Sequence, residues 1–358
     1  MNALWNLHAL VTGQPTETQC VRQQLEASAV PVSAADCRTC PNPCDEGHEA
    51  YPRRFDIDMQ TSMLGSVKPY RRQVIISTGK CDWERDVTGE KGSLASYLLQ
   101  VEKHSEAHEI RPVPPKSNGK AVHPVSGVFR SDDSTRVSIL NGNHTSLSCT
   151  ENAETVLVLP DYKLISEVSR SIDGAQRLWE AAVHPDVGRF GATLENSPLK
   201  TWVIPYSCVI LLCSHKRRDN RCSIAAPKLE RAFIQCLEER GWSADTALED
   251  PSITLGKPIE EYEGTAEERD EHIMGQLKEV AAAKRVLIIR NSHMGGHKYA
   301  GNCILYTPQG SSIWYGRVTP HEVPSVVENT ILAGLVLPPL LRGGLNISRP
   351  GCTSLHDW

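Results

Sequence analysis

The sequence lacks a long hydrophobic run and a basic N-terminus. Its longest apolar-rich stretch, 331–341, is interrupted by Gly334, Pro338 and Pro339, so no window reaches the ~18 uninterrupted apolar residues that a membrane-spanning helix needs. Residues 1–20 contain neither Lys nor Arg, which disfavours both a secretory signal and a mitochondrial presequence. We therefore expect a cytoplasmic protein without a membrane span, and a mitochondrial location is the alternative.

An excess of positive charge is also missing. The chain has 38 Lys and Arg against 43 Asp and Glu, which gives a formal net charge of −5. Its short basic stretch, 216–221, has no interleaved aromatic side chains. A nucleic-acid-binding role is therefore not expected. No pair of catalytic carboxylates stands out, so glycoside hydrolysis is not indicated.

Cysteine, by contrast, is abundant for a chain expected in a reducing compartment. The 358 residues include 12 Cys, too few for a disulfide scaffold but enough to indicate metal ligands or redox thiols. Cys208, Cys236 and Cys303 lie in apolar or helical patterns and are expected in the core. A chain of this length favours two domains.

The hydrophobic pattern predicts an α/β protein. A polar connector at 184–200 separates an N-terminal domain (1–195) from a C-terminal domain (196–340), which a tail (341–358) follows. The first half favours a strand at 155–159 and a helix at 164–182. The second half favours, in order, a strand at 202–213, a helix at 225–240, a weak strand at 252–255, a helix at 265–284, strands at 286–289, 302–306 and 312–317, and a helix at 321–335. This β-α-β-α-β-β-α order is that of a thioredoxin-like fold.

Four side chains in the second half could bind a metal. Cys213 and Cys222 flank a polar loop directly after a strand, and His293 and His297 directly follow the strand 286–289. Neighbouring parallel strands bring the loops that follow them to the same edge of a sheet, so the four side chains can converge. Two thiolates and two imidazoles suit a tetrahedral Zn²⁺, or a [2Fe–2S] cluster with two Cys on one iron and two His on the other.

Neither spacing is diagnostic, and four unrelated side chains remain an open interpretation. Gly295 and Gly296 between the histidines predict a loop whose backbone passes close to something bulky, and a cluster is bulkier than one zinc ion. His215 and His321 have no partner at ligand spacing and are not expected to be ligands. Basic side chains inside the cysteine loop could help to hold two thiolates and an anionic cluster, and they are Lys216, Arg217, Arg218 and Arg221.

The combination of motifs in the second half resembles the sucrase/ferredoxin-like family of thioredoxin-like ferredoxins. The resemblance is carried by C-S-H-K-R-R-D-N-R-C at 213–222, H-M-G-G-H-K-Y-A-G-N at 293–302 and I-W-Y-G-R-V at 313–318. The first half is also similar, which implies a second, degenerate thioredoxin-like domain there. Its matching motifs are Cys37-x-x-Cys40-x-x-x-Cys44, Tyr51-Pro52, Thr78-Gly79, Asp82-Trp83 and Leu159-Pro160-Asp161.

The resemblance implies a [2Fe–2S] cluster in the C-terminal domain, with Cys213, Cys222, His293 and His297 as its ligands. It implies a one-electron carrier in redox homeostasis and oxidant tolerance, reduced by an unidentified reductase, rather than an enzyme with its own substrate. Neutral imidazole in place of thiolate raises the potential of a cluster. Protonation of the non-ligating ring nitrogen would couple the electron to a proton.

Cys37, Cys40 and Cys44 leave several roles open. With His48 they could bind Zn²⁺ or another cluster, or they could act as a redox dithiol. We favour a structural or occasionally redox-active role. A thiol oxidoreductase that acts through Cys37 and Cys40 is therefore one alternative function, and a zinc-stabilised interaction protein with the four Cys and His ligands is another.

The sequence ends in Asp357 and Trp358. This end is similar to the tail that client proteins present to the cytosolic iron–sulfur assembly targeting complex. The similarity makes that complex an expected partner.

Overall fold

The structure is a computed structural model that describes residues 17–35, 49–108 and 125–358. A 12-stranded mixed sheet runs through both halves of the chain in the order β2-β12-β11-β10-β7-β9-β3-β1-β4-β5-β6, with β8 paired to the start of β9. The strands of the first half are β1 (Arg72–Ser77), β2 (Val128–Phe129), β3 (Val137–Gly142), β4 (Ala153–Leu159) and β5 (Lys163–Ser169). Those that follow are β6 (Lys200–Val203), β7 (Cys208–Cys213), β8 (Ser243–Asp245), β9 (Arg285–Asn291), β10 (Cys303–Tyr306), β11 (Ser312–Tyr315) and β12 (Leu341–Leu345).

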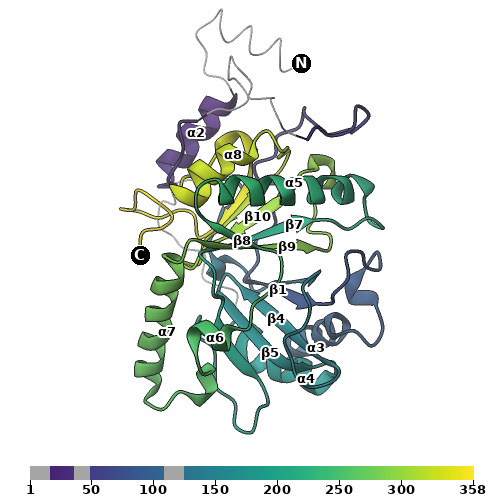
Figure 1. Cartoon of the computed structure of the whole chain (residues 1–358), viewed down its shortest axis with the longest axis vertical. Helices are drawn as coiled ribbons and strands as arrows, with labels where there is room; N and C mark the ends of the chain where they lie inside the picture. The colour runs from purple at the N-terminus through teal and green to yellow at the C-terminus, as the bar shows by residue number, and fades with distance from the viewer. Residues whose placement is uncertain (1–16, 36–48, 109–124) are drawn as a thin grey trace, which may run out of the picture.

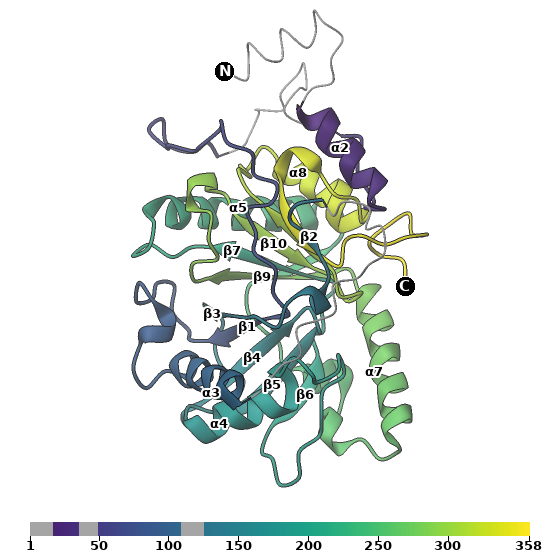
Figure 2. The same ribbon diagram turned by 180° about the vertical axis from the view of Figure 1, so that it is seen from behind.

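Helices cover the sheet in two groups. In Figure 1, α5 and α8 lie over the strands of the upper part, whereas α3 and α4 lie against the strands of the lower part. Figure 2, from behind, shows α7 along the side of the lower strands. The helices are α2 (Glu17–Ala27), α3 (Leu94–His108), α4 (Ile172–Leu178), α5 (Asn220–Glu238), α6 (Pro251–Leu255), α7 (Ala266–Ala281) and α8 (Val323–Ser325), which continues as a π-helix over Val326–Leu332.

The second half follows the predicted element order with three corrections. The strand predicted at 202–213 is two strands, since β6 ends at Val203 and pairs with β5, whereas β7 begins at Cys208 and pairs with β9. The strand that follows α5 is β8, because the strand predicted at 252–255 is the short helix α6, which Asp250 caps at Ser252 N. Helix α5 begins at Asn220 rather than at 225, so it already includes Cys222. The predicted capping box of α7 is confirmed, since the side chains of Thr265 and Glu268 each accept from the other's backbone N–H.

The predicted helix at 164–182 is wrong over its first third. Residues Lys163–Ser169 form β5, which pairs with β4 on one side and β6 on the other. Leu164, Ile165 and Val168 are all fully buried there. An apolar pattern over so few residues fits either a helix or a strand. Here the segment is a strand because it pairs with a neighbouring strand on each side. The helix is confined to α4 and the π-helical turn Trp179–Val183.

The two halves pair at three places in the sheet: β3 with β9, β2 with β12, and β5 with β6. Strands β3 and β9 pair antiparallel at Gly142 and Asn291, while β9 pairs parallel with β7 along its whole length. β12 lies within the segment 341–358 that was expected as a tail, and Leu355 near the chain end is fully buried. The structure is therefore mixed α/β with one continuous sheet, and the division into 1–195, 196–340 and 341–358 stays a prediction.

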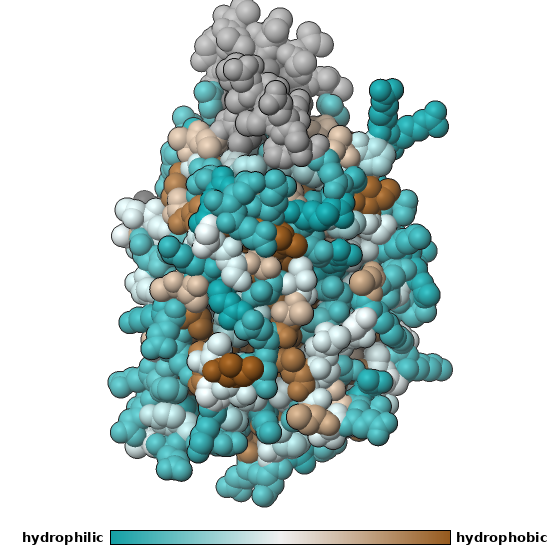
Figure 3. Space-filling view, in the orientation of Figure 1, coloured by the Kyte–Doolittle hydropathy of each residue, from teal (hydrophilic) through white to brown (hydrophobic). Residues whose placement is uncertain are grey.

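The molecular surface is mostly hydrophilic on the face that Figure 3 shows, where apolar side chains gather only in small, scattered groups. Among the described residues, no helix combines the length and the apolar character needed to cross a membrane.

Candidate metal centre

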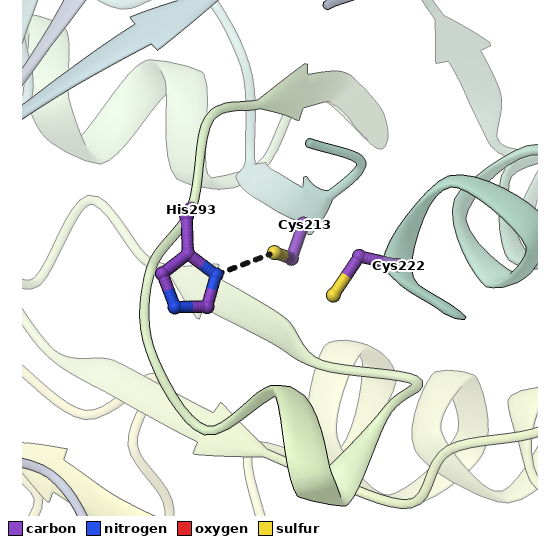
Figure 4. A group of neighbouring side chains, drawn as sticks. All are labelled: Cys213, Cys222 and His293. Atoms are coloured by element: carbon purple, nitrogen blue, oxygen red, sulfur yellow. Dashed lines mark hydrogen bonds between the residues drawn. The ribbon is translucent and has the colours of Figure 1, made fainter. Parts of the chain in front are cut away.

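Two buried cysteines are placed by the end of a strand and the start of a helix. Alternate residues of β7 pack on opposite faces of the sheet, and Cys213 ends the strand on the same face as Leu211. The chain then turns, and the side chain of Asp219 caps α5 by accepting from Arg221 N. The first turn of α5 thus carries Cys222 back towards Cys213 (Figure 4).

His293 reaches the same place from the neighbouring strand. The register of the parallel pair sets Cys213 opposite Asn291, so the loop after β9 starts beside the end of β7. The Sγ of Cys213 lies 3.9 Å from the Nδ1 of His293. One ligand atom from each of Cys213, Cys222 and His293 lies within 4.8 Å of the others. The expected convergence of the two loops is therefore observed for these three residues.

His297 lies at the edge of this group. Its ring centroid is 5.4 Å from that of His293, and it is exposed at the start of the 3₁₀ turn His297–Tyr299. Partial desolvation lowers the pKa of His297, and the nearby Asp219 carboxylate opposes that shift. Three of the four predicted ligands are thus brought together with the fourth beside them. Their roles as ligands stay a prediction.

The two buried thiols shift each other's pKa in opposite directions. The hydrogen bond with Cys222 lowers the pKa of Cys213, an effect that burial opposes and His293 reinforces. The same pairing with Cys213, together with burial, raises the pKa of Cys222. Cys213 is therefore the thiol of the pair that loses its proton more readily.

Glycine and an asparagine shape the loop that carries the two histidines. Gly295 and Gly296 have φ values of +88° and +70°, which side-chain-bearing residues rarely adopt. Asn302 donates from Nδ2 to the carbonyl of Gly296 (2.9 Å) and accepts from Cys213 N at its own carbonyl (3.3 Å). One residue therefore links both ligand-bearing loops. The prediction of a loop at Gly295-Gly296 is confirmed.

His215 is buried beside this site and positions its loop. Its Nδ1 accepts from the backbone N–H of His293 at 3.3 Å. Its Nε2 therefore carries the hydrogen, and it lies 2.9 Å from the carbonyl of Trp83 in the first half of the chain. No spacing in the sequence indicates this role, because Trp83 and His215 come together only in the folded chain.

The basic residues of the cysteine loop differ in their relation to the thiols, and Arg221 is the one whose charge acts on Cys222, where it opposes the rise in pKa. Lys216, Arg217 and Arg218 are exposed, and Arg217 and Arg221 form ion pairs with acidic side chains. The buried cation is Arg342 of β12, far along the chain, whose guanidinium donates to the carbonyl of Gly295.

The remaining cysteines fall into three groups: core thiols, exposed or half-buried thiols, and residues outside the description. The exposed or half-buried thiols are Cys20, Cys81, Cys149 and Cys352. Cys208, Cys236 and Cys303 belong to one hydrophobic cluster, as expected. Burial raises the pKa of Cys208 to about 12, which makes it an inert thiol. Cys37, Cys40, Cys44 and His48 lie outside the described residues, so the roles suggested for them stay predictions.

At the chain end, the carboxylate of Asp357 accepts from the backbone N–H groups of Thr353 and Ser354, and these bonds lower its pKa. Trp358 is 48% exposed.

Comparisons with known proteins cover both halves. The sucrase/ferredoxin-like family model matches residues 63–343. Actin patches distal protein 1 of Saccharomyces cerevisiae is 26% identical over 306 residues, which cover 84% of this chain and 79% of that protein. Altered inheritance of mitochondria protein 32 of Meyerozyma guilliermondii is 30% identical over 138 residues, which cover 38% of this chain and 35% of that protein. No solved structure matches the chain. Because the family model matches most of the chain, including both loops of the candidate centre, the protein belongs to the sucrase/ferredoxin-like family.

Proposed function

We propose that this protein is a [2Fe–2S] electron carrier whose cluster is held by Cys213, Cys222, His293 and His297. The observation that carries the proposal is the convergence of both thiols and the His293 ring within 4.8 Å at the ends of two parallel strands. Membership of a family described as ferredoxin-like supports it. When bound, such a cluster takes up and releases one electron at a time.

The surrounding residues suit that role. Cys213 and Cys222 are almost fully buried, so water has little access to the thiol side of the centre. His297 is exposed, which gives the imidazole side contact with solvent and with a partner protein. An exposed imidazole can exchange a proton with water when the charge of the centre changes, and this supports proton-coupled transfer.

A zinc-stabilised interaction protein is the second candidate, and one distance favours it. Two ligands on one tetrahedral zinc ion, one sulfur and one nitrogen, lie about 3.6 Å apart. The Cys213 Sγ to His293 Nδ1 distance of 3.9 Å is close to that value. The same four side chains would then close a structural site with no redox role.

Metal analysis of the full chain separates the two candidates. The protein is purified without air from iron-replete cells, and its iron, sulfide and zinc are counted. Red-brown protein with about two iron and two sulfide per chain, and a Rieske-like low average g value after dithionite, supports the carrier. Colourless protein with about one zinc per chain refutes it in favour of the zinc site.

The finer fold, the compartment and the partners belong to the same proposal. We propose two thioredoxin-like units, a cytoplasmic location, an unidentified reductase as electron donor and cluster delivery through Asp357 and Trp358. The half-exposed Trp358 supports the last point. The name of the mitochondrial-inheritance relatives makes mitochondria the alternative. Cell fractionation tests the compartment, and deletion of Trp358 should lower the iron content of the protein in cells if the tail delivers the cluster.

A further inference from the structure

Arg342 is a buried cation without a carboxylate partner. Its side chain is 1% exposed. The guanidinium donates to Ser66 Oγ (3.1 Å), to the carbonyl of Gly295 (3.2 Å) and to Asn302 Oδ1 (2.7 Å), and all three acceptors are neutral. Within residues 17–35, 49–108 and 125–358, no Asp or Glu lies within ion-pairing distance of it.

The other fully buried arginine shows the usual arrangement. Arg72 is 0% exposed, and its Nε donates to the carboxylate of Asp161 at 2.7 Å. Buried charges in proteins are paired or bind metals, because an isolated charge loses its hydration without replacement. Arg342 therefore needs negative charge from another source.

The candidate centre supplies that charge. The guanidinium donates to the carbonyl of Gly295, which lies between His293 and His297, and to the side chain of Asn302, whose own carbonyl accepts from Cys213 N. Burial lowers the pKa of Arg342 to about 10. Two aromatic rings complete the surroundings, with the guanidinium carbon 5.6 Å from the Tyr299 ring centroid and 5.8 Å from that of Trp314. The cation thus lies in a water-poor site where its field reaches the thiols with little screening.

We propose that Arg342 is the buried counter-ion of the metal centre and the anchor of the loop 293–297. This inference rests on the proposed iron–sulfur function. One electron passes from a reductant to the cluster, no covalent bond forms or breaks, and the centre becomes more negative by one charge. A fixed buried cation stabilises the reduced form more than the oxidised form, so it raises the potential. Arg342 is a positioning residue and does not itself bind iron.

The basic residues of the cysteine loop are less suited to this role. Arg217 pairs with Glu84, and Arg221 pairs with Asp219, so their charges are locally balanced. Lys216 and Arg218 are exposed, and water screens their fields.

The test is the midpoint potential of the iron-loaded full chain, titrated with dithionite and mediators and followed by EPR. Arg342→Gln should lower the equilibrium constant for reduction at least tenfold, which is about 59 mV for one electron. Arg342→Lys keeps the charge and should shift the potential by less than half as much. Arg240→Gln removes the same charge about 27 Å away along α5 from Cys222 and should leave the potential unchanged. The inference is overturned if the midpoint potential of Arg342→Gln equals that of the wild type. It is also overturned if the potential of Arg342→Lys is as low as that of Arg342→Gln.

A second variant covers the case in which Arg342→Gln does not fold. Asn302→Asp places a carboxylate where Oδ1 now lies 2.7 Å from the guanidinium, and it also removes the Nδ2 donor to the Gly296 carbonyl. It should also lower the potential, and an unchanged value overturns the inference. Wild-type protein without iron would instead refute the proposed function itself, so the two failures are distinguishable.

Discussion

Replacing Gly296 by alanine should damage the candidate centre far more than the same change at its neighbour Gly295. Both glycines have positive φ values, +70° and +88°. An alanine in the left-handed region costs roughly 1–2 kcal/mol at either position. A Cβ on Gly296 would also collide with the guanidinium of Arg342, whereas nothing lies within 4 Å of a Cβ on Gly295.

The collision adds a cost that the backbone does not. Arg342 is held by three hydrogen bonds and two aromatic rings, so it cannot move aside without losing contacts. Inserting a methyl group into such packing costs typically 1–3 kcal/mol. We therefore expect Gly296→Ala to lower the free energy of unfolding by about 2–5 kcal/mol, and Gly295→Ala by about 1–2 kcal/mol.

The assay is urea denaturation of both variants beside the wild type, with metal counted per chain after purification. Gly296→Ala should lose metal as well as stability, because the displaced guanidinium shifts the loop between His293 and His297. Gly295→Ala should keep most of its metal. Equal losses in the two variants would show that backbone conformation alone matters here and that Arg342 does not hold the loop.

Four further predictions test other parts of the molecule. His293→Cys should keep a cluster but lower its potential and flatten its pH dependence, since thiolate replaces a neutral ring; an unchanged potential in redox titration rejects His293 as a ligand. His215→Ala leaves two buried backbone groups, the His293 N–H and the Trp83 carbonyl, without their partner, at a cost of about 1–3 kcal/mol each. Iron should therefore pass to a chelator faster from this variant than from the exposed control His272→Ala. Equal rates of iron release would contradict the positioning role of His215. Burial lowers the pKa of His144 to about 4. The free energy of unfolding should therefore fall by about 3 kcal/mol as pH falls from about 6.5 to 4, because the unfolded chain binds a proton that the folded chain does not. A His144→Gln variant that shows the same loss in urea denaturation would refute the assignment to His144. Thr265→Ala removes the cap of α7 and should lower the free energy of unfolding by about 1 kcal/mol without moving the redox potential, which thermal unfolding and titration together check.

Local patterns predicted the parts of the structure that local forces decide. The glycine loop after β9 and the capping box of α7 depend on neighbouring residues, and both are found as expected. The apolar run 202–213 is extended as predicted but is divided between β6 and β7. The run 164–169 was misread because its pairing partners β4 and β6 decide its conformation. The start of α5 was placed too late, since Asp219 as its cap lies inside a stretch that reads as a polar loop.

The sequence predicted the candidate ligands of the site, but it did not predict the residues that hold their loops in place. Cys and His are recognisable from residue type and spacing. Arg342 and His215 act through contacts with residues far away in sequence, and no spacing rule reports such contacts. A lone arginine in the apolar stretch 335–347 was the one signal in the sequence, because charged side chains are rarely buried without a purpose.

Residues of the first half of the chain form hydrogen bonds with the residues that support the candidate centre. Ser66 accepts from Arg342, the carbonyl of Trp83 lies against His215, and the carbonyl of Asp56 accepts from Arg221 at 2.9 Å. The pairs β3–β9, β2–β12 and β5–β6 hold the two halves in one sheet. Removal of the first half would take away the partner of β9 at Asn291, the Ser66 acceptor of Arg342 and the Trp83 acceptor of His215. The family model likewise spans both halves, 63–343. The functional unit is therefore the joined pair of halves, and the candidate centre depends on the joint between them.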